Sequence, residues 1–453
     1  MAESERGNAG PVVALRFADR ALACDAVAAP TFQSLKGMHD LVPPTSQRWL
    51  ELISRFAEQF GRSAYRYIQT PILEELAVFA RVGEGTDVVT KEMYDFTDRD
   101  GTHIALRPES TAGVARSVIQ HRPLTPFKVW YFSQHFRHEN TQAGRYRQHH
   151  QLGAECFGAA EPDVDVELIV GLWDFYRSLG LSQLRLELNS IGDPESRARY
   201  MDALRAFLNG RVGDLDPEDA AKIDRHPMRV LDSKRTATRA ALDGVPTLME
   251  SMSEVALAHF DRVQQGLAAA GVPVTLNPRL VRGLDYYTHT VFEIISEAMD
   301  AAQSTIGGGG RYDGLVESLG GPPLPGVGFG SGIERILLAC DREGVFETPE
   351  LTVDAFVVEL GGDGSYGRDL LLELRRGGVS CDRAYGGRSL RAQMKQADRS
   401  GARWGIIVGD DERAGGVVSL RDLRSSDHEG AQTTVPRGEI VDVLRRRVQI
   451  DAG

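Results

Sequence analysis

Helical periodicity marks three segments in the first half of the chain. In residues 49–60 and 164–179, apolar side chains recur every three or four positions, which predicts two amphipathic helices. A third helix is expected after Pro108 and as far as Ile119, because its small and apolar residues directly follow a proline.

Strand-like patterns lie between these helices. Residues 127–136 are aromatic and apolar, and in residues 184–188 leucines alternate with other residues, so both segments predict strands. Further strands are expected at 67–73, where Pro71 interrupts the pattern, at 91–107 as a hairpin around the turn 98–101, and at 280–295.

Two glycine-rich segments, residues 307–310 and 326–332, are expected to be loops, the second of which opens a helix through Leu338. Neither has the spacing of a standard nucleotide-binding motif. No G-x-x-x-x-G-K-[ST] occurs, and residues 326–332 follow Gly-Pro-Pro-Leu-Pro and not a strand. If the protein binds a nucleotide, it must therefore use a binding site other than one of these standard motifs.

The order of elements predicts an α/β (α+β) fold in three parts. Residues 1–30 form a tail, residues 31–345 the main domain, and residues 351–453, beyond Pro349, a small α/β domain. In that last part strands at 353–360, 404–408 and 417–420 are expected to alternate with helices at 368–376, 390–399 and 440–448. Residues 195–275 are charged and helical, which indicates a helical insertion in the main domain.

Composition narrows the class of protein. The 453 residues are 42% hydrophobic, with no apolar run long enough to span a bilayer and no signal-peptide pattern in residues 1–30. Four cysteines lie far apart, which indicates neither a disulfide framework nor a zinc site and favours a reducing cytoplasm.

The net charge of −12 argues against a nucleic-acid partner. Its distribution weakens that argument. From Leu351 onward 16 basic and 16 acidic residues balance, so residues 1–350 carry the whole excess. A local basic surface on such a domain can still bind phosphates.

The most informative segment is residues 280–293. Arg282 offers a rigid fork of donors for a carboxylate or phosphate, and Tyr286 and Tyr287 offer aromatic faces with polar tips. This combination fits a pocket for a small zwitterion next to a phosphate. Taken alone, the segment also fits a strand end with a surface arginine.

Longer segments resemble a known family. Residues 136–155 look like motif 2 of class II aminoacyl-tRNA synthetases, residues 326–335 like motif 3, and residues 37–48 like motif 1, the usual dimer contact. Residues 280–293 resemble the histidine-specific signature of histidyl-tRNA synthetases. Further blocks similar to this family lie at 82–94, 106–112, 229–234, 308–315 and 388–398.

The resemblance implies a class II catalytic domain at 31–345 and an anticodon-binding domain at 351–453. It implies that L-histidine is activated with ATP and Mg²⁺ and then transferred to the 3′ end of tRNA(His). The catalytic residues would be Arg137 and Arg282 at the α-phosphate and Arg335 at the γ-phosphate, with Glu139 near the adenine. A cytoplasmic homodimer without membrane contact is also implied.

The same resemblance assigns the substrate contacts. Glu109, Thr111 and Gln151 match positions at the α-amino end of histidine, and Glu155, Tyr287 and Tyr312 match positions at the side-chain end; Tyr286 is a further expected histidine contact. Tyr312 and Gln151 also fit a packing role. Arg145 and Arg147 lie in the motif 2 loop that meets the acceptor stem; they also fit a solvated loop. Arg388, Arg391, Lys395 and Arg399 have the spacing of one helix face, which suits phosphates or solvent equally.

The chain departs from the family pattern at several positions: Asn140-Thr141 stand where Arg-Pro is usual, His149 replaces an aromatic residue, Ser110 a glycine and His289 an arginine, and Gly330 stands where alanine is common. Two alternatives therefore stay open. One is a paralogue that activates an amino acid for an acceptor other than tRNA. The other, a non-catalytic regulatory subunit of histidine biosynthesis, is disfavoured because such subunits usually lack the anticodon domain.

Overall fold

The computed structural model describes residues 32–83, 88–231, 233–280, 286–300, 303–425 and 432–451. Several predicted features lie outside these ranges. They are the tail at 1–30, part of the block at 82–94, Asp232 and Arg282.

An eight-stranded sheet forms the centre of the main domain, with the strand order β1-β5-β6-β11-β10-β9-β7-β8. Its strands are β1 (Arg66–Tyr67), β5 (Phe127–Phe136), β6 (Gln148–Phe157), β7 (Leu184–Ser190), β8 (Val274–Leu276), β9 (Thr288–Ser296), β10 (Thr305–Arg311) and β11 (Gly326–Gly332). The two edge strands pair in parallel and the other neighbours pair antiparallel.

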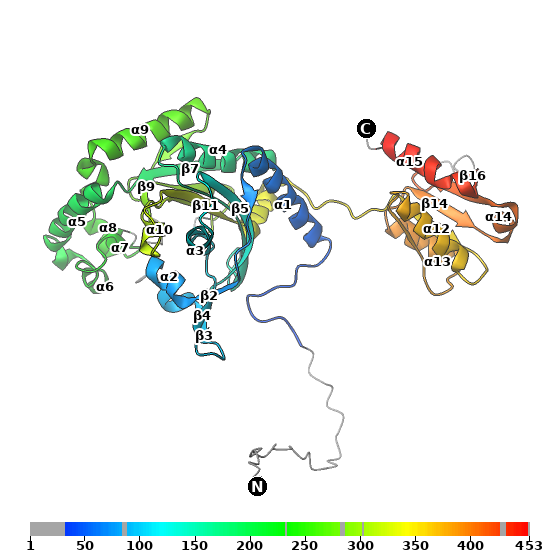
Figure 1. Ribbon diagram of the computed structural model, residues 1–453, viewed down its shortest axis with the longest axis horizontal. Coiled ribbons are helices and arrows are strands. Elements are labelled where there is room, and N and C mark those ends of the chain that lie inside the picture. Colours follow the sequence, from blue (N-terminus) through cyan, green and yellow to red (C-terminus); the bar gives the residue numbers. More distant parts are fainter. Residues whose placement is uncertain are drawn as a thin grey trace, which may run out of the picture. The chain divides into compact units, whose positions relative to one another are not determined.

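Helices cover both faces of this sheet (Figure 1). They are α1 (Thr45–Arg62), α2 (Leu76–Gly83), α3 (Thr111–His121), α4 (Pro162–Ser178), α9 (Glu254–Ala269), α10 (Leu315–Ser318) and α11 (Ile333–Glu343). A separate three-stranded sheet contains β2 (Leu73–Glu75), β3 (Tyr94–Thr97) and β4 (His103–Leu106) in the order β2-β4-β3.

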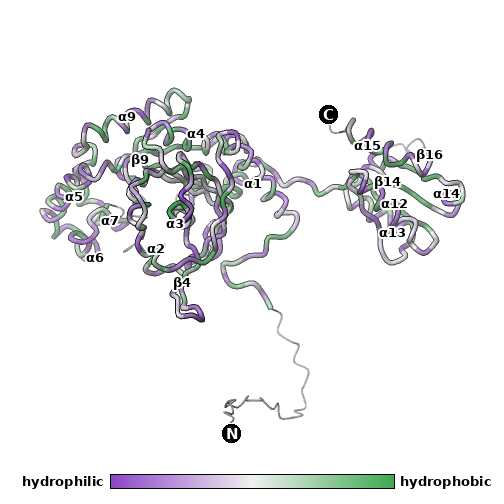
Figure 2. Tube along the Cα trace, viewed as in Figure 1, coloured by the Kyte–Doolittle hydropathy of each residue, from purple (hydrophilic) through white to green (hydrophobic). Residues whose placement is uncertain are grey.

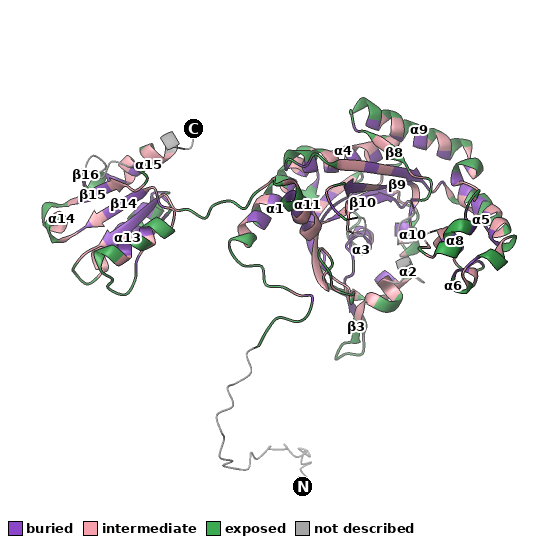
Figure 3. Ribbon diagram, turned by 180° about the vertical axis from the view of Figure 1, so that it is seen from behind, coloured by how far each residue is buried: buried purple, intermediate pink, exposed green. Residues whose placement is uncertain are grey.

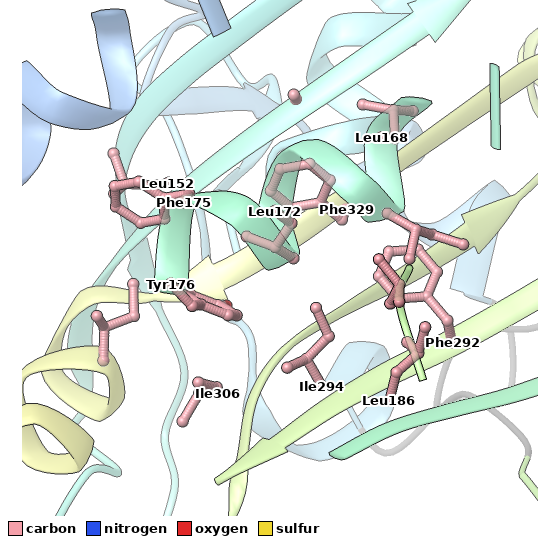
Figure 4. Packing of buried hydrophobic residues seen from close by; sticks show 14 of the residues in the cluster. Leu152, Leu168, Leu172, Phe175, Tyr176, Leu186, Phe292, Ile294, Ile306 and Phe329 are labelled. Atoms are coloured by element: carbon pink, nitrogen blue, oxygen red, sulfur yellow. The ribbon is translucent and has the colours of Figure 1, made fainter. Parts of the chain in front are cut away.

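The larger hydrophobic core lies between the sheet and helices α1, α4, α9 and α11. Figure 4 shows Leu172, Phe175 and Tyr176 of α4 beside residues of the strands such as Leu152 and Ile294. A second core lies on the other face, where α3 packs against β5 and β9. The site described below lies on the side of this second core.

The helical segment after β7 has its own small core. It contains α5 (Pro194–Asn209), α6 (Pro217–Ala220), α7 (Met228–Leu231) and α8 (Thr236–Ala241). Helix α9, by contrast, packs its apolar face on α4 and joins the larger core, and Figure 2 shows its alternation of hydrophobic and hydrophilic residues. The end of the predicted insertion is therefore part of the main packing unit.

The C-terminal part forms a five-stranded sheet in the order β13-β12-β14-β15-β16. Its elements are β12 (Ala355–Glu359), α12 (Ser365–Arg376), β13 (Cys381–Arg383), α13 (Leu390–Arg399), β14 (Trp404–Val408), α14 (Asp410–Gly415), β15 (Val417–Asp422), β16 (Gln432–Pro436) and α15 (Ile440–Asp451). Figure 3 shows buried strands in this sheet and an exposed outer surface on α13.

The two glycine-rich segments are strands and not the predicted loops. Strands β10 and β11 lie side by side in the middle of the sheet, with Gly309 opposite Phe329 and Gly310 opposite Gly328. A Cβ atom at Gly309 would overlap the carbonyl oxygen of Gly328, and one at Gly328 would overlap the carboxylate of Glu155. Close packing therefore requires glycine at these positions. In the sequence alone, such glycines appear only as a break in the periodic pattern.

Replacing Gly309 with alanine is therefore expected to destabilise the protein by about 1–3 kcal/mol or more, because the new methyl meets backbone atoms that cannot rotate away. Gly61→Ala is the matched control. Gly61 lies near the end of α1 with open space around it, so alanine should stabilise by about 0.5–1 kcal/mol. Urea unfolding of both variants measures the difference, and equal effects would contradict this explanation.

Other predicted boundaries also change. The segment 67–73 is divided between β1 and β2, which belong to different sheets, and the strand predicted from residue 280 begins at Thr288. Strands β13 and β16 and helix α14 were not expected, since each has at most six residues and carries little periodic signal. In the described part of the chain, no helix combines the length and apolar character needed to cross a membrane.

Candidate active site

Two long neighbouring strands bring several predicted site residues together. Strands β5 and β6 pair antiparallel over ten residues, from Phe127 opposite Phe157 to Phe136 opposite Gln148. Arg137 directly follows β5, and Gln151 and Glu155 lie on β6. The hairpin thus places an arginine at its loop end and a carboxylate deeper in the sheet.

A polar pocket lies at the loop end of this hairpin. Arg137, Arg145 and Arg335 line it, together with two carboxylates, Glu139 and Glu334. The three arginines come from the end of β5, from the loop before β6 and from the start of α11. A pocket with this lining suits a ligand that carries several negative charges.

Arg335 is fixed at the wall of the pocket. Its Nε donates to the carbonyl of Gly144 at 3.2 Å, and one terminal nitrogen donates to the carbonyl of Thr305 at 2.9 Å. Desolvation lowers the pKa of Arg335, and the neighbouring charges of Arg145 and Arg137 lower it further, against the opposing effect of Glu139. An anion in the pocket would relieve this repulsion.

His149 lines the same pocket as a neutral side chain. Desolvation, followed by the charges of Arg137, His150 and Arg335, holds the pKa of His149 well below its usual range. At the next position, His150 contacts Glu334 through Nδ1 at 2.9 Å. His149 therefore adds polarity to the pocket wall without adding charge.

Glu155 lies in a cage of hydroxyl groups. It is fully buried, and it accepts hydrogen bonds from Thr111 Oγ1 at 2.7 Å, from Tyr131 at 3.3 Å and from Tyr312. Burial raises the pKa of Glu155 to about 8, and the hydroxyl hydrogen bonds oppose that rise. A buried acid with several hydroxyl partners can recognise a ligand group that donates or accepts a proton.

Glu109 lies at the start of α3, close to the cage. Its carboxylate accepts hydrogen bonds from the backbone amides of Thr111 at 2.6 Å and Ala112 at 2.9 Å, so it caps the first turn. Burial raises the pKa of Glu109, and the two amide bonds and the charge of Arg137 counteract the rise. Thr111 thus connects both carboxylates.

Three tyrosines complete the cage wall. The ring of Tyr286 lies 4.7 Å from that of Tyr287 and 5.6 Å from that of Tyr312, measured between centroids. Their pairing brings the segment after residue 285 to the end of β10, which is far away in sequence. Arg282 precedes Tyr286 and lies outside the described residues, so its position stays a prediction.

The remaining predicted residues divide into two groups. Gln151 lines the arginine pocket, Glu139 lies 3.8 Å from Arg145 in an ion pair, and Arg147 donates to the Glu139 carbonyl at 3.5 Å.

The second group lies in the C-terminal domain. Arg391, Lys395 and Arg399 are exposed on α13, whose other side buries Gln393 and Ala397. Arg388 is exposed too, but it precedes the first residue of α13 and does not share the predicted helix face.

Sequence reasoning missed Tyr131, Tyr146 and Thr305. Tyr131 supplies the third hydroxyl of the Glu155 cage, while Tyr146 and Thr305 line the arginine pocket. The period-two pattern of β5 contained a signal for Tyr131, because it lies opposite Gly153 and thus diagonal to Glu155 on the paired strand.

Comparison with known proteins identifies the family. The profile of histidyl-tRNA synthetase matches residues 37–336, and the profile of the anticodon binding domain matches residues 354–447. The chain belongs to the histidyl-tRNA synthetase family. The first match spans the arginine pocket, the Glu155 cage and the helical insertion.

Curated relatives and solved structures agree with this family. A histidine–tRNA ligase of Rubrobacter xylanophilus is 44% identical over 411 residues, which cover 88% of this chain and 96% of the relative. One from Nocardia farcinica is 45% identical over 421 residues, covering 92% and 98%. The crystal structure of apo S. aureus histidyl-tRNA synthetase aligns with a TM-score of 0.78 and 35% identity, over 91% of this chain and 100% of that chain.

Proposed function

We propose that this protein is a ligase that activates L-histidine with ATP to histidyl-adenylate and then transfers the histidyl group to the 3′ end of tRNA(His). Membership of the histidyl-tRNA synthetase family over most of the chain supports this function. The observation that carries it is the buried Glu155 with its three hydroxyl partners, next to a pocket lined by three arginines.

In the activation step, the carboxylate of histidine attacks the α-phosphorus of ATP and pyrophosphate leaves. The step needs fixed positive charge around a crowded phosphorus more than it needs proton transfer. We assign Arg137 to the α-phosphate and Arg335 to the γ-phosphate, with Glu139 near the adenine; both arginines line the polar pocket. Arg282 keeps its predicted role at the α-phosphate.

Mg²⁺ is proposed to arrive with ATP. Among the residues that the structure describes, no three His, Cys, Asp or Glu side chains gather as a metal site. Glu334 is a carboxylate of the pocket lining that could supply an oxygen, and Mg²⁺ in such sites is held mainly by phosphates and water. When bound, the ion would neutralise charge on the outer phosphates.

Histidine is proposed to bind with its imidazole at Glu155, within reach of Tyr287 and Tyr312, and with Tyr286 against its ring. Glu109, Thr111 and Gln151 are assigned to its α-amino end. Because an apolar side chain cannot form hydrogen bonds with the buried polar groups of the cage, amino acids without a polar ring should be rejected by about 10⁴–10⁵-fold. No separate editing step is then needed.

For the tRNA, we propose two contact regions. Arg145 and Arg147 lie in the loop before β6 and are assigned to the acceptor stem. Arg388, Arg391 and Lys395 are exposed on or just before α13 and are assigned to phosphates of the anticodon region. Both assignments follow the match to the anticodon binding domain and the family motifs.

The two regions can be separated by mutation. Replacing Arg391 and Lys395 together by glutamate should raise the KM for tRNA about tenfold or more, because each lost charged hydrogen bond to a phosphate is worth about 1.5 kcal/mol. Histidine-dependent ATP–pyrophosphate exchange should stay unchanged. Arg368→Glu, at an exposed arginine on α12 of the same domain, is the control and should leave the KM for tRNA unchanged.

The domain limits, the oligomer and the compartment are also proposals. We propose a catalytic domain at 31–345, an anticodon-binding domain at 351–453, and an insertion narrower than 195–275, since α9 packs in the main core. A homodimer is supported by Leu41, Val42 and Leu50, exposed apolar residues in the motif 1 region. The free, buried cysteines at 156, 340 and 381 fit a cytoplasmic protein.

The test of the function is charging of total tRNA by the purified protein with ATP, Mg²⁺ and labelled histidine. Histidine on tRNA at ordinary turnover is the expected result. A folded protein that exchanges pyrophosphate with histidine but charges no tRNA would favour a paralogue with another acceptor. A protein that binds histidine without exchange would favour a regulatory subunit.

A further inference from the structure

A buried hydrogen bond joins the amino-acid side of the site to strand β5. The hydroxyl of Ser110 lies 2.8 Å from Nε2 of His135. Both residues are almost fully enclosed, with exposures of 2% and 0%. Ser110 immediately precedes α3, and His135 is the last residue but one of β5. Neither residue is among those assigned to substrate.

The bond adds to a set of hydrogen bonds between residues 107–110 and the end of β5. The segment from Arg107 to Ser110 already meets the end of β5 through backbone groups: the amide of Phe136 donates to the Arg107 carbonyl at 3.0 Å, and Nε of Arg137 donates to the Pro108 carbonyl at 2.9 Å. Nε of Arg107 also donates to the carbonyl of Gln134 at 2.8 Å. The Ser110–His135 bond adds one hydrogen bond between two side chains to this set.

The sequence positions of Ser110 and His135 connect this hydrogen bond to the site. Ser110 lies between Glu109 and Thr111, which are assigned to the α-amino end of histidine. Thr111 contacts Glu155 in the cage, while Ser110 contacts β5. His135 in turn lies two residues before Arg137, the arginine assigned to the α-phosphate. The bond therefore spans the two groups whose separation decides whether the carboxylate of histidine can reach phosphorus.

His135 is suited to a fixed, uncharged bond. Burial, followed by the charges of His149, Arg107 and Arg137, holds the pKa of His135 well below its usual range. The imidazole therefore stays neutral at working pH, and the bond does not switch with protonation. It sets a distance and carries no charge.

The His135 side chain also destabilises the folded protein. His135 Nδ1 is buried and has no hydrogen-bond partner within the described ranges. An unpaired buried polar atom destabilises a protein by about 1–3 kcal/mol, which an apolar side chain at this position would avoid. A residue that destabilises the fold and contacts the site's first helix turn is better explained by function than by stability.

We propose that Ser110 and His135 are a positioning pair, which holds the α-amino contacts of histidine at a fixed distance from Arg137. This inference rests on the proposed function. It assigns no contact with substrate to either side chain. The pair acts through Glu109, Thr111 and Arg137.

The test compares variants in ATP–pyrophosphate exchange with varied histidine and varied ATP. Ser110→Ala and His135→Met remove the bond, and each should lower kcat/KM for histidine about tenfold while the KM for ATP stays within twofold. The double variant should be no worse than the weaker single variant, because both remove the same interaction. Ser110→Gly carries the same expectation if the alanine variant does not fold.

Rescue separates the hydrogen bond from packing. His135→Gln keeps an amide at about the place of Nε2 that can donate or accept a hydrogen bond, and it should recover most of the activity that His135→Met loses. Thr238→Val is the matched control for stability, since it removes a buried hydroxyl hydrogen bond to Asp219 in the insertion. It should lower the Tm without a change in kcat/KM.

Two failures can be told apart in this assay. If the parent exchanges no pyrophosphate with histidine, the proposed function fails and the positioning role fails with it. If the parent is active and both single variants lower the Tm but keep kcat/KM within twofold, the bond is structural only and the inference is wrong. Equal activity of His135→Gln and His135→Met would also overturn it.

Discussion

Replacing Glu155 by glutamine is expected to lower kcat/KM for histidine by about two orders of magnitude while making the unliganded protein more stable at pH 8. The loss follows from replacing the carboxyl group that Thr111, Tyr131 and Tyr312 hold, since a mismatched buried hydrogen bond costs about 1–3 kcal/mol. The gain follows from burial, which raises the pKa of Glu155 to about 8.

The pH window of this effect is fixed by two pKa values. In the unfolded chain Glu155 ionises near 4.5, whereas the folded, unliganded protein keeps the proton up to about pH 8. Between these values the unfolded state binds fewer protons, so wild-type stability falls as the pH rises. At about 1.4 kcal/mol per unit, the advantage of the glutamine variant grows to a few kcal/mol across the window.

Urea unfolding at pH 5 and pH 8 measures this gap. The difference between Glu155→Gln and the parent should increase in favour of the variant at pH 8. Glu58→Gln, at an exposed glutamate of α1, should follow the parent at both values. The idea is falsified if Glu155→Gln and the parent lose the same stability between pH 5 and pH 8.

Replacing Arg137 by alanine is expected to lower the rate of adenylate formation by about 10²–10³-fold. The guanidinium lines the pocket and is held by the Pro108 carbonyl, so it is preorganised for charge that develops at the α-phosphate. Arg137→Lys should retain part of the rate, because the charge remains but the planar fork is lost. Pyrophosphate exchange at saturating histidine and ATP is the measurement.

Arg62→Ala is the control for Arg137→Ala. Arg62 forms an exposed ion pair with Glu58 on α1, and such pairs contribute little, so its loss should change neither rate nor stability measurably. Adenylate formation by Arg137→Ala at the parental rate would exclude the arginine-lined pocket as the phosphate site.

Periodic segments were predicted well from sequence. The helix expected at 390–399 and the strand expected at 404–408 have the same bounds in the structure, and the strand at 127–136 does too. Each has a clear repeat of apolar positions and no glycine or proline competing for the backbone, apart from one glycine in β14. Local pattern and tertiary packing agree there, so the pattern suffices.

The glycine strands show where such reasoning fails. Gly307 and Gly310 in β10 are buried beside bulky partners, since added Cβ atoms would overlap the hydroxyl of Tyr176 and the carbonyl of Thr290. Those partners lie on α4 and β9, and no local pattern reveals them. Long-range packing therefore overrode the local preference of glycine for turns.

The candidate site was found by motif and not by geometry. Glu155 lies on β6, Thr111 begins α3 and Tyr312 directly follows β10, and only their matching motifs connected them in advance. Tyr131 and His135 belong to no such motif and were missed, although both lie on the buried side of β5. Side chains that contact motif residues but lie outside the motif are difficult to recognise from the sequence.

The glycine floor of the arginine pocket has a consequence for inhibitor selectivity. Gly307, Gly330 and Gly332 present backbone to the pocket; an added Cβ would overlap the Tyr176 hydroxyl at Gly307 and crowd the Gln151 amide at Gly330, whereas Gly332 has room for one. A compound that rests mainly on this floor would therefore bind relatives that keep these glycines. Among such relatives, discrimination must come from the rim, where His149 presents a neutral, hydrogen-bonding ring.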